Sequence, residues 1–360
     1  SGGFERRNSA IPRLHRAGFD HWQGNECNHN YNQSPFFLND DTKQKFWEGY
    51  DAIAQSRCAA KLIKKFAQNA QPFFLTVSWG PPHDPYHSAP QEYQDLYDKS
   101  NINIPKNVPS EHHKKARDQL HGYYSHISAL DDCLKIILRS LKKSNLEDKT
   151  IVVFTSDHGD MIFSHGLTRK LFPFEESVRV PLIIRDPANK HRAGQQCNAP
   201  IDAPDLMPTL LGLANLKQED HLQGQDWSMI IRGQKSGNSS DAGLLSAPVQ
   251  AGPLQLYGVQ AYRGVRTSRH TYVRNASGAW LLFDNFDDPF QMNNLVKNKT
   301  AKGIKDDLEQ LLRTKLNKLN DNFESSDEII AKHRLQQHVA RTGLGAQIPW
   351  SYPWRTGDED

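Results

Sequence analysis

The chain has 360 residues, which is enough for one large domain and a smaller one. Its 44 basic and 41 acidic residues leave a net charge of +3 without a long basic block, which argues against nucleic acid or an anionic membrane as the main partner. No apolar run approaches the ~18–20 residues that a membrane-spanning helix needs.

The first residues lack the apolar centre of a signal peptide, which leaves the export of a longer precursor open. The cysteines are scattered without C-x-x-C spacing, so the sequence argues against zinc-binding and redox motifs. They are Cys27, Cys58, Cys133 and Cys197. They are too few to assign a compartment, and their disulfide pairing stays open.

The N-terminal part of the chain predicts loops, one helix and one strand. Residues 1–40 are polar and loop-like. From Asp51 onward apolar residues recur at helical spacing. The apolar run 73–79 predicts a central strand, which the prolines of 80–86 end.

The middle of the chain alternates helix and strand. Apolar residues between 127 and 141 recur at helical spacing, and this helix leads into the run 151–155, which predicts a buried strand. A further strand is predicted at 180–184, and another helix opens at Asp205. This alternation is typical of a mostly parallel sheet sandwiched by helices, so the predicted fold class is α/β.

The pattern changes after about residue 228. Residues 228–256 are rich in Gly, Ser and Gln and predict a linker or surface excursion. An apolar stripe over 304–319 predicts a helix that covers a small antiparallel sheet. The strands of that sheet are expected at 262–266, 271–274 and 279–283.

These patterns divide the chain into three parts. We expect the main α/β domain over residues 1–245 and a smaller α+β subdomain, an antiparallel sheet plus a helix, over 246–330. Residues 331–360 are polar and predict a tail on the surface.

The most informative stretch follows the strand at 151–155, where the chain runs into Ser-Asp-His-Gly. Ligands of open α/β sheets bind just beyond the carboxyl ends of the strands. A carboxylate and an imidazole placed there, Asp157 and His158, with Lys170 further along, suit a cation and an anionic group held together. The pattern predicts a metal-assisted esterase site, of which this chain carries a part.

Several motifs around this stretch occur in a specific order: 156–159, 165–170, 174–176 and 179–183. Pro-His-Asp-Pro at 82–85 and Asp-Leu-Met-Pro-Thr at 205–209 add to them. Together they resemble the sulfatase family of the alkaline-phosphatase-like superfamily, with its second conserved block, its Pro-His-x-Pro loop and its Asp-Leu-x-Pro-Thr helix. Residues 263–295 are similar to the family's C-terminal subdomain, and the likeness covers nearly all of 15–325.

One part of the family pattern is absent from the sequence. A sulfatase begins with tandem aspartates, then Cys/Ser-x-Pro-x-Arg and Lys-x-His, and the closest match here, 88–92, has glutamate in place of the arginine. The resemblance implies that this chain is the C-terminal portion of a sulfatase. The nucleophile, a formylglycine in this family, is then expected in a missing N-terminal segment, and the chain alone is expected to be inactive.

The resemblance also implies roles for four residues. Asp157 and His158 match the metal-ligand pair, with Ca²⁺ as the implied metal and Mg²⁺ or a transition metal left open by the imidazole. Lys170 matches the lysine that contacts sulfate. His83 matches the loop histidine that donates to the sulfate ester and can protonate the leaving oxygen. The plain alternatives are a metal-free turn, a solvated lysine and an ordinary loop histidine.

Other polar residues are weaker candidates. His29, Tyr31 and Asn32 combine imidazole, phenol and amide groups, a mixture that binds sugar hydroxyls, and we expect them to contact substrate unless they only pack a loop. Asp131 and Asp132 fit a solvated helix face.

Two further features near the predicted site have simple structural explanations. Glu175 and Arg179 have the i, i+4 spacing of a helix ion pair. His165 can support the site or only the fold.

The sequence therefore predicts a sulfuric-ester hydrolase that removes sulfate from a sulfated carbohydrate by a metal-assisted formylglycine mechanism. Two alternatives stay open: a phosphomonoesterase or phosphodiesterase of the same superfamily, and a non-catalytic pseudosulfatase that binds sulfated glycans. By resemblance the protein is exported, to a periplasmic, extracellular or lysosomal location. The particular glycan and the oligomeric state stay open.

Overall fold

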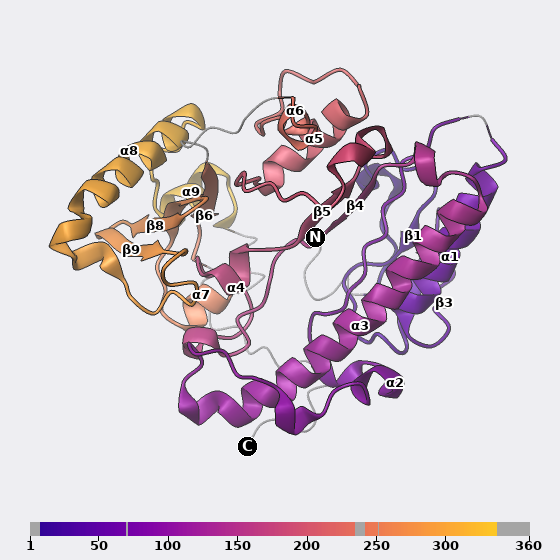
Figure 1. Ribbon diagram of the computed structural model, residues 1–360, viewed down its shortest axis with the longest axis horizontal. Coiled ribbons are helices and arrows are strands. Elements are labelled where there is room, and N and C mark those ends of the chain that lie inside the picture. The colour runs from indigo at the N-terminus through magenta and orange to yellow at the C-terminus, as the bar shows by residue number, and fades with distance from the viewer. Residues whose placement is uncertain (1–7, 70, 235–241, 251, 337–360) are drawn as a thin grey trace. The chain divides into compact units, whose positions relative to one another are not determined.

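The computed structural model describes residues 8–69, 71–234, 242–250 and 252–336 (Figure 1). The chain divides into two compact units. The first is built from Ser1–Val153 and Ile184–Lys190, and the second from Phe154–Ile183 and His191–Asp360. In the described ranges, no helix combines the length and the apolar character that crossing a membrane requires.

Two helices that pack against each other organise the first unit, α1 (Asp51–Phe66) and α3 (His113–Lys143). Both confirm predicted helices, although α3 begins well before residue 127. Ala52 and Ala129 are fully buried, and such small side chains let the two helix backbones approach closely. The remaining elements of this unit are short: α2 (Gln91–Gln94), and the antiparallel strands β1 (Gln23–Gly24), β2 (Pro35–Leu38) and β3 (Lys45–Phe46).

The predicted central strand at 73–79 is wrong for the structure as described. Residues 72–80 have no assigned regular structure, and the side chain of Phe74 is 70% exposed. A strand is defined by hydrogen bonds to a neighbouring strand, and an apolar run alone does not supply that neighbour.

The strands that flank the predicted site are present, but their side chains are only partly buried. β4 (Val152–Thr155) and β5 (Leu182–Arg185) form a two-stranded sheet. The prediction of a strand is confirmed in both places. The sequence predicted a buried strand at β4. In the structure β4 is half-buried and its last residue is exposed, because the described sheet has only these two strands to cover one another.

The second unit contains the antiparallel sheet and covering helix that the sequence predicts. The helix is α8 (Lys302–Lys318), and its buried face carries Leu308, Leu312 and Leu316. The strand order is β6-β7-β8-β9. The strands are β6 (Ala242–Ala247), β7 (Tyr262–Thr267), β8 (His270–Asn275) and β9 (Gly278–Asp284).

The predicted linker at 228–256 is wrong where the structure describes it. It contains α6 (Ser228–Ile231), β6 and α7 (Pro253–Leu256), and β6 pairs with β7 along its whole length. The apolar pair Leu244–Leu245 carries this strand within a Gly- and Ser-rich composition. β6 also spans the predicted domain limit at residue 245. Most of the predicted tail, 337–360, lies outside the described residues.

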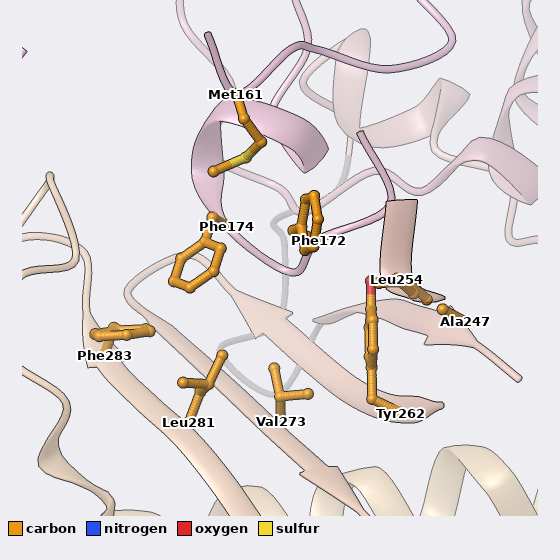
Figure 2. Packing of buried hydrophobic residues seen from close by; sticks show 9 residues of the cluster. All are labelled: Met161, Phe172, Phe174, Ala247, Leu254, Tyr262, Val273, Leu281 and Phe283. Atoms are coloured by element: carbon orange, nitrogen blue, oxygen red, sulfur yellow. The ribbon is translucent and has the colours of Figure 1, made fainter. Parts of the chain in front are cut away.

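The four-stranded sheet is covered on both faces because its side chains alternate. Tyr272 and Leu282 pack with α8. Their neighbours in sequence pack against the segment that follows β4 (Figure 2). The residues of this second core are Met161, Phe172, Phe174, Ala247, Leu254, Tyr262, Val273, Leu281 and Phe283. The sheet therefore supports the chain segment on which the predicted metal and sulfate ligands lie.

The other helices of the second unit are short. α4 (Glu175–Val178) follows the predicted site segment, α5 (Leu206–Leu213) confirms the helix predicted from Asp205, and α9 (Ser326–Lys332) closes the described chain.

Candidate active site

Asp157 and His158 lie in the turn directly after β4. The Nδ1 atom of His158 is 2.8 Å from the carbonyl oxygen of Gly159. Because a carbonyl only accepts, Nδ1 carries the proton, and in the neutral ring Nε2 holds the lone pair. That Nε2 atom is 3.4 Å from Oδ2 of Asp157, whose side chain is 83% exposed. An imidazole nitrogen and a carboxylate oxygen thus form a pair of donors for a metal ion.

The conformation of this turn depends on Gly159. Its N–H donates to the carbonyl oxygen of Ser177 over 2.9 Å. A Cβ atom at this position would lie 2.0 Å from the carbonyl oxygen of Glu176, which no side chain tolerates. The Asp-His-Gly turn is therefore docked on α4 through a contact that only glycine permits.

Lys170 lies in a loop that the same helix holds. The N–H of Met161 donates to the carbonyl of Arg169 over 2.7 Å, and the N–H of Leu171 donates to Oγ of Ser177 over 3.2 Å. The loop also contains left-handed backbone at Ile162, Phe163, His165, Arg169 and Leu171. Such backbone is costly for residues with side chains and persists where the surroundings enforce it. Packing of Met161 and Phe172 against the sheet supplies that constraint.

The residues at this turn fit a metal ion, although they cannot complete its coordination alone. A neutral imidazole nitrogen and an exposed carboxylate are two suitable ligands. Ca²⁺ takes six to eight ligands and Mg²⁺ takes six, so further donors must come from other groups. The identity of the metal stays a prediction.

His83 lies in the first unit, in the Pro-His-Asp-Pro loop. Its Nδ1 atom is 2.8 Å from Oδ1 of Asp84 and 3.0 Å from the Asp84 carbonyl oxygen. Because both neighbours are acceptors, Nδ1 acts as the donor and the ring orientation is fixed by the next residue in the chain. The His83 side chain is 16% exposed, so the ring remains accessible.

The segment 28–32 lies against this loop. The rings of His29 and His83 are 4.5 Å apart between centroids. Nδ2 of Asn32 donates to the carbonyl of Ser88 over 2.9 Å. The structure therefore brings together two segments separated by about fifty residues of sequence, and substrate contact by His29 and Asn32 stays a prediction.

Tyr31 is a buried residue that supports the Pro-His-Asp-Pro loop. Its side chain is fully buried, and its hydroxyl donates to the carbonyl of Asp84 over 3.2 Å. Burial raises the pKa of the Tyr31 hydroxyl, which keeps it protonated as a donor. A Cβ on Gly80 would lie 2.6 Å from the tyrosine ring. This position favours a supporting role over the direct sugar contact that the sequence suggests.

Sequence reasoning missed His126, which also supports the loop. It is fully buried on α3, with Nδ1 2.6 Å from the Tyr50 hydroxyl and Nε2 3.4 Å from the Pro85 carbonyl. Burial lowers the pKa of His126 to about 4, so the ring is neutral. The available signal was its place in the stripe Gly122, His126, Ala129 and Cys133, the buried face of the helix.

The weaker candidates of the sequence analysis have ordinary structural roles. Asp131 is exposed on α3, and Asp132 accepts from Tyr93 over 3.2 Å, in line with a solvated helix face. His165 stacks on Phe174 with 4.2 Å between ring centroids.

Glu175 does pair with Arg179 at 3.9 Å, as the sequence predicts, but its closer partner is Arg266. The guanidinium of Arg266 binds both carboxylate oxygens, at 2.9 and 2.8 Å, and so joins α4 to β7.

Comparisons with known proteins place the chain in a family. Residues 1–216 match the family model described as Sulfatase, and residues 164–319 match the model described as N-sulphoglucosamine sulphohydrolase, C-terminal. The chain belongs to the sulfatase family.

Two curated relatives show how much of such a protein the chain represents. It is 36% identical over 330 residues to the ulvan-active sulfatase of Formosa agariphila, covering 91% of this chain and 64% of that protein. It is 29% identical over 338 residues to the endo-4-O-sulfatase of Bacteroides thetaiotaomicron, covering 86% of this chain and 64% of that protein. The chain thus spans less than two thirds of the length of either relative.

A solved structure agrees on the fold. The putative sulfatase yidJ of Bacteroides fragilis superposes with a TM-score of 0.75 at 27% identity, covering 88% of this chain and 69% of that chain. This likeness confirms the predicted fold class, the alkaline-phosphatase-like α/β fold with a C-terminal antiparallel subdomain.

Proposed function

We propose that this chain carries the metal-binding and sulfate-binding part of a hydrolase for sulfate esters of a carbohydrate. The observation that carries the proposal is the turn after β4, where Nε2 of His158 faces the carboxylate of Asp157. The same helix, α4, holds both this turn and the loop of Lys170. The Formosa relative is named for ulvan and the Bacteroides relative for endo-4-O-sulfate removal, which supports a carbohydrate substrate.

Each residue has a role that follows from its chemistry. Asp157 and His158 would hold the metal, which when bound offsets negative charge on the sulfate and on the nucleophile. The ammonium of Lys170 binds a sulfate oxygen as a compact charge. His83 in its doubly protonated form, with Nδ1–H held by Asp84, gives the proton on Nε2 to the leaving sugar oxygen and becomes the neutral ring.

The nucleophile comes from outside these residues in our proposal. None of the four cysteines is followed by the Pro and Arg of the family motif. We propose that an upstream segment would supply a formylglycine as the nucleophile and that the protein is exported. The fraction of each relative that this chain spans supports this division.

The test uses the complete gene product that contains this chain. It is assayed on sulfated polysaccharides, on an aryl sulfate and on the matching aryl phosphate. We expect sulfate release, with highest kcat/KM on a polysaccharide. Turnover of the phosphate alone would overturn the proposal in favour of a phosphoesterase, and glycan binding without turnover would favour a pseudosulfatase.

Substitutions at the two candidate catalytic residues test their roles. His83→Asn should lower kcat about 10²–10⁴-fold because it removes the general acid. Lys170→Met should lower kcat/KM about 10²–10³-fold because it removes a charged donor to sulfate. His15→Asn, an exposed histidine of the first unit, is the matched control and should leave both parameters unchanged. Equal effects of His83→Asn and His15→Asn would refute the assignment.

A further inference from the structure

A second cluster of metal-ligating side chains lies in the first unit, more than seventy residues before Asp157 and His158 in the sequence. Among the residues that the structure describes, His29, His83 and Asp84 form a group in which one ligand atom of each lies within 4.8 Å of the others. All three side chains are half-buried. The Sγ atom of Cys27, a free and exposed cysteine, is 3.9 Å from Nε2 of His29.

We propose that these four residues, Cys27, His29, His83 and Asp84, bind a divalent transition-metal ion of the zinc class. Two imidazoles, a thiolate and a carboxylate are the ligand types that Zn²⁺ takes in fours. The sequence argues against zinc motifs because it has no C-x-x-C spacing, and it could not reveal this site because two of its ligands lie more than fifty residues from the other two.

Three of the four donors already lie close together, and Cys27, which is near His29 but outside the 4.8 Å group, must rotate toward them to complete tetrahedral coordination. Zn–N bonds of about 2.1 Å and a Zn–S bond of about 2.3 Å put neighbouring nitrogen and sulfur ligands about 3.6 Å apart. The distance of 3.9 Å between Sγ of Cys27 and Nε2 of His29 is close to this value. Because Nδ1 of His83 donates to Asp84 over 2.8 Å, the metal would take the lone pair of the other ring nitrogen, Nε2.

The donor set also selects against the metal expected at the other site. Ca²⁺ and Mg²⁺ prefer oxygen ligands, and only Asp84 offers oxygen here. Soft sulfur and imidazole nitrogen favour Zn²⁺, Co²⁺ and Ni²⁺ over these hard cations. The two sites should therefore respond to different ions.

Binding at this cluster has a consequence for catalysis, which rests on the proposed function. A metal-bound nitrogen of His83 cannot also deliver a proton to a leaving oxygen. The zinc-class ion is therefore an inhibitor that removes the general acid, and the cluster acts as a metal-sensitive switch at the Pro-His-Asp-Pro loop.

The binding test needs no enzymatic activity. Co²⁺ is titrated into the reduced, complete gene product carrying Asp157→Asn and His158→Gln, which disable the other site. We expect one tightly bound Co²⁺ with visible bands of tetrahedral symmetry and a thiolate-to-cobalt charge-transfer band. Cys27→Ser should abolish the charge-transfer band, and His29→Gln or Asp84→Asn should weaken binding at least tenfold. Cys197→Ser, at another exposed free cysteine, is the matched control and should change nothing.

Binding that is unaffected by His29→Gln and Asp84→Asn would overturn the proposal, as would the absence of any stoichiometric Co²⁺ binding. Inhibition is tested on the complete gene product with Zn²⁺ at saturating Ca²⁺. Cys27→Ser should keep the basal rate and raise the inhibitory Zn²⁺ concentration at least tenfold, while Cys197→Ser should leave it unchanged. If the gene product proves to be no sulfatase, the Co²⁺ result still decides whether the site exists.

Discussion

His126 and Asp51 are both buried in the first unit, and burial shifts their pKa values in opposite directions. Burial lowers the pKa of His126 to about 4 and raises the pKa of Asp51 to about 7. In each case the neutral form is favoured in the folded protein. Because the two effects oppose each other between pH 4 and 7, the wild-type chain alone would hide both.

Replacing His126 exposes its contribution to the free energy of unfolding. The folded pKa lies below the unfolded value of about 6.5, so the stability that neutral His126 supplies is complete above pH 6.5 and is lost as the pH falls toward 4. The cost of His126→Gln should therefore be about 2 kcal/mol larger at pH 7.5 than at pH 5.0. Urea unfolding of both proteins at the two pH values measures this difference.

Asp51→Asn should behave in the opposite way. The folded pKa lies above the unfolded value of about 3.9, so the penalty for the buried carboxylate grows as the pH rises toward 7. Relative to wild type, this variant should gain about 2.5 kcal/mol in unfolding free energy between pH 5.0 and 7.5. Changes of the same sign in both variants would contradict the assignment of these two shifts.

The sequence predicts individual site residues where the ligands are close in the chain. Asp157 and His158 are adjacent and follow a recognisable strand, so their candidacy needs no tertiary contact. The contact between His29 and His83 joins positions more than fifty residues apart, and only the fold can reveal it. The burial of Tyr31 was hidden for the same reason, since a polar neighbourhood in sequence does not report what covers a ring in space.

At the scale of elements, the docking of a turn on α4 positions the predicted metal ligands. The N–H of Gly159 donates to Ser177, and Glu175 of the same helix is tied to Arg266 of β7. The sheet, the helix and the turn are thus connected in one continuous set of contacts within the second unit.

Gly159→Ala tests this docking. The added methyl would lie 2.0 Å from a backbone oxygen, so the turn must shift away from α4. We expect a loss of about 1–3 kcal/mol in unfolding free energy, as for other overpacked sites, and weaker metal binding at Asp157 and His158. Calorimetric titration with Ca²⁺ and urea unfolding measure the two effects.

Gly303→Ala provides the matched control for this substitution. Gly303 lies in α8, and a Cβ there meets nothing within 4 Å. Alanine is the better helix former, so this variant should gain up to about 1 kcal/mol. If both alanine variants had the same effect, close packing at Gly159 would not be what positions the turn.

The sequence predicted helices correctly from their periodicity, but it failed for some strands, because a strand forms only where a neighbouring strand pairs with it. The apolar stripes of α1, α3 and α8 are readable because each helix satisfies its own backbone. The run 73–79 has strand composition but no paired neighbour in the described chain, and β6 has weak composition but a partner along its whole length. Strand formation depends on pairing across the sequence, which composition does not specify.

At the scale of the whole molecule, the apolar run 73–79 is a segment of strand composition that has no strand partner among the described residues. It combines aromatic and β-branched residues with no charge, the composition of a segment that associates with other strands. In the described residues the β4–β5 sheet has only two strands and offers this run no strand partner. We expect an upstream segment of the gene product to help cover this run, and the 360-residue chain alone to aggregate through it.

Phe74→Lys tests this expectation in the 360-residue chain. A charge on an exposed position of the run should lower light scattering at micromolar concentration several-fold. The unfolding free energy should change by less than about 0.5 kcal/mol, because the side chain is 70% exposed and contributes little to the core. Leu14→Lys is the matched control, since Leu14 is 88% exposed in a polar segment. Equal reductions in scattering by the two variants would show that net charge, and not strand association by this run, governs aggregation.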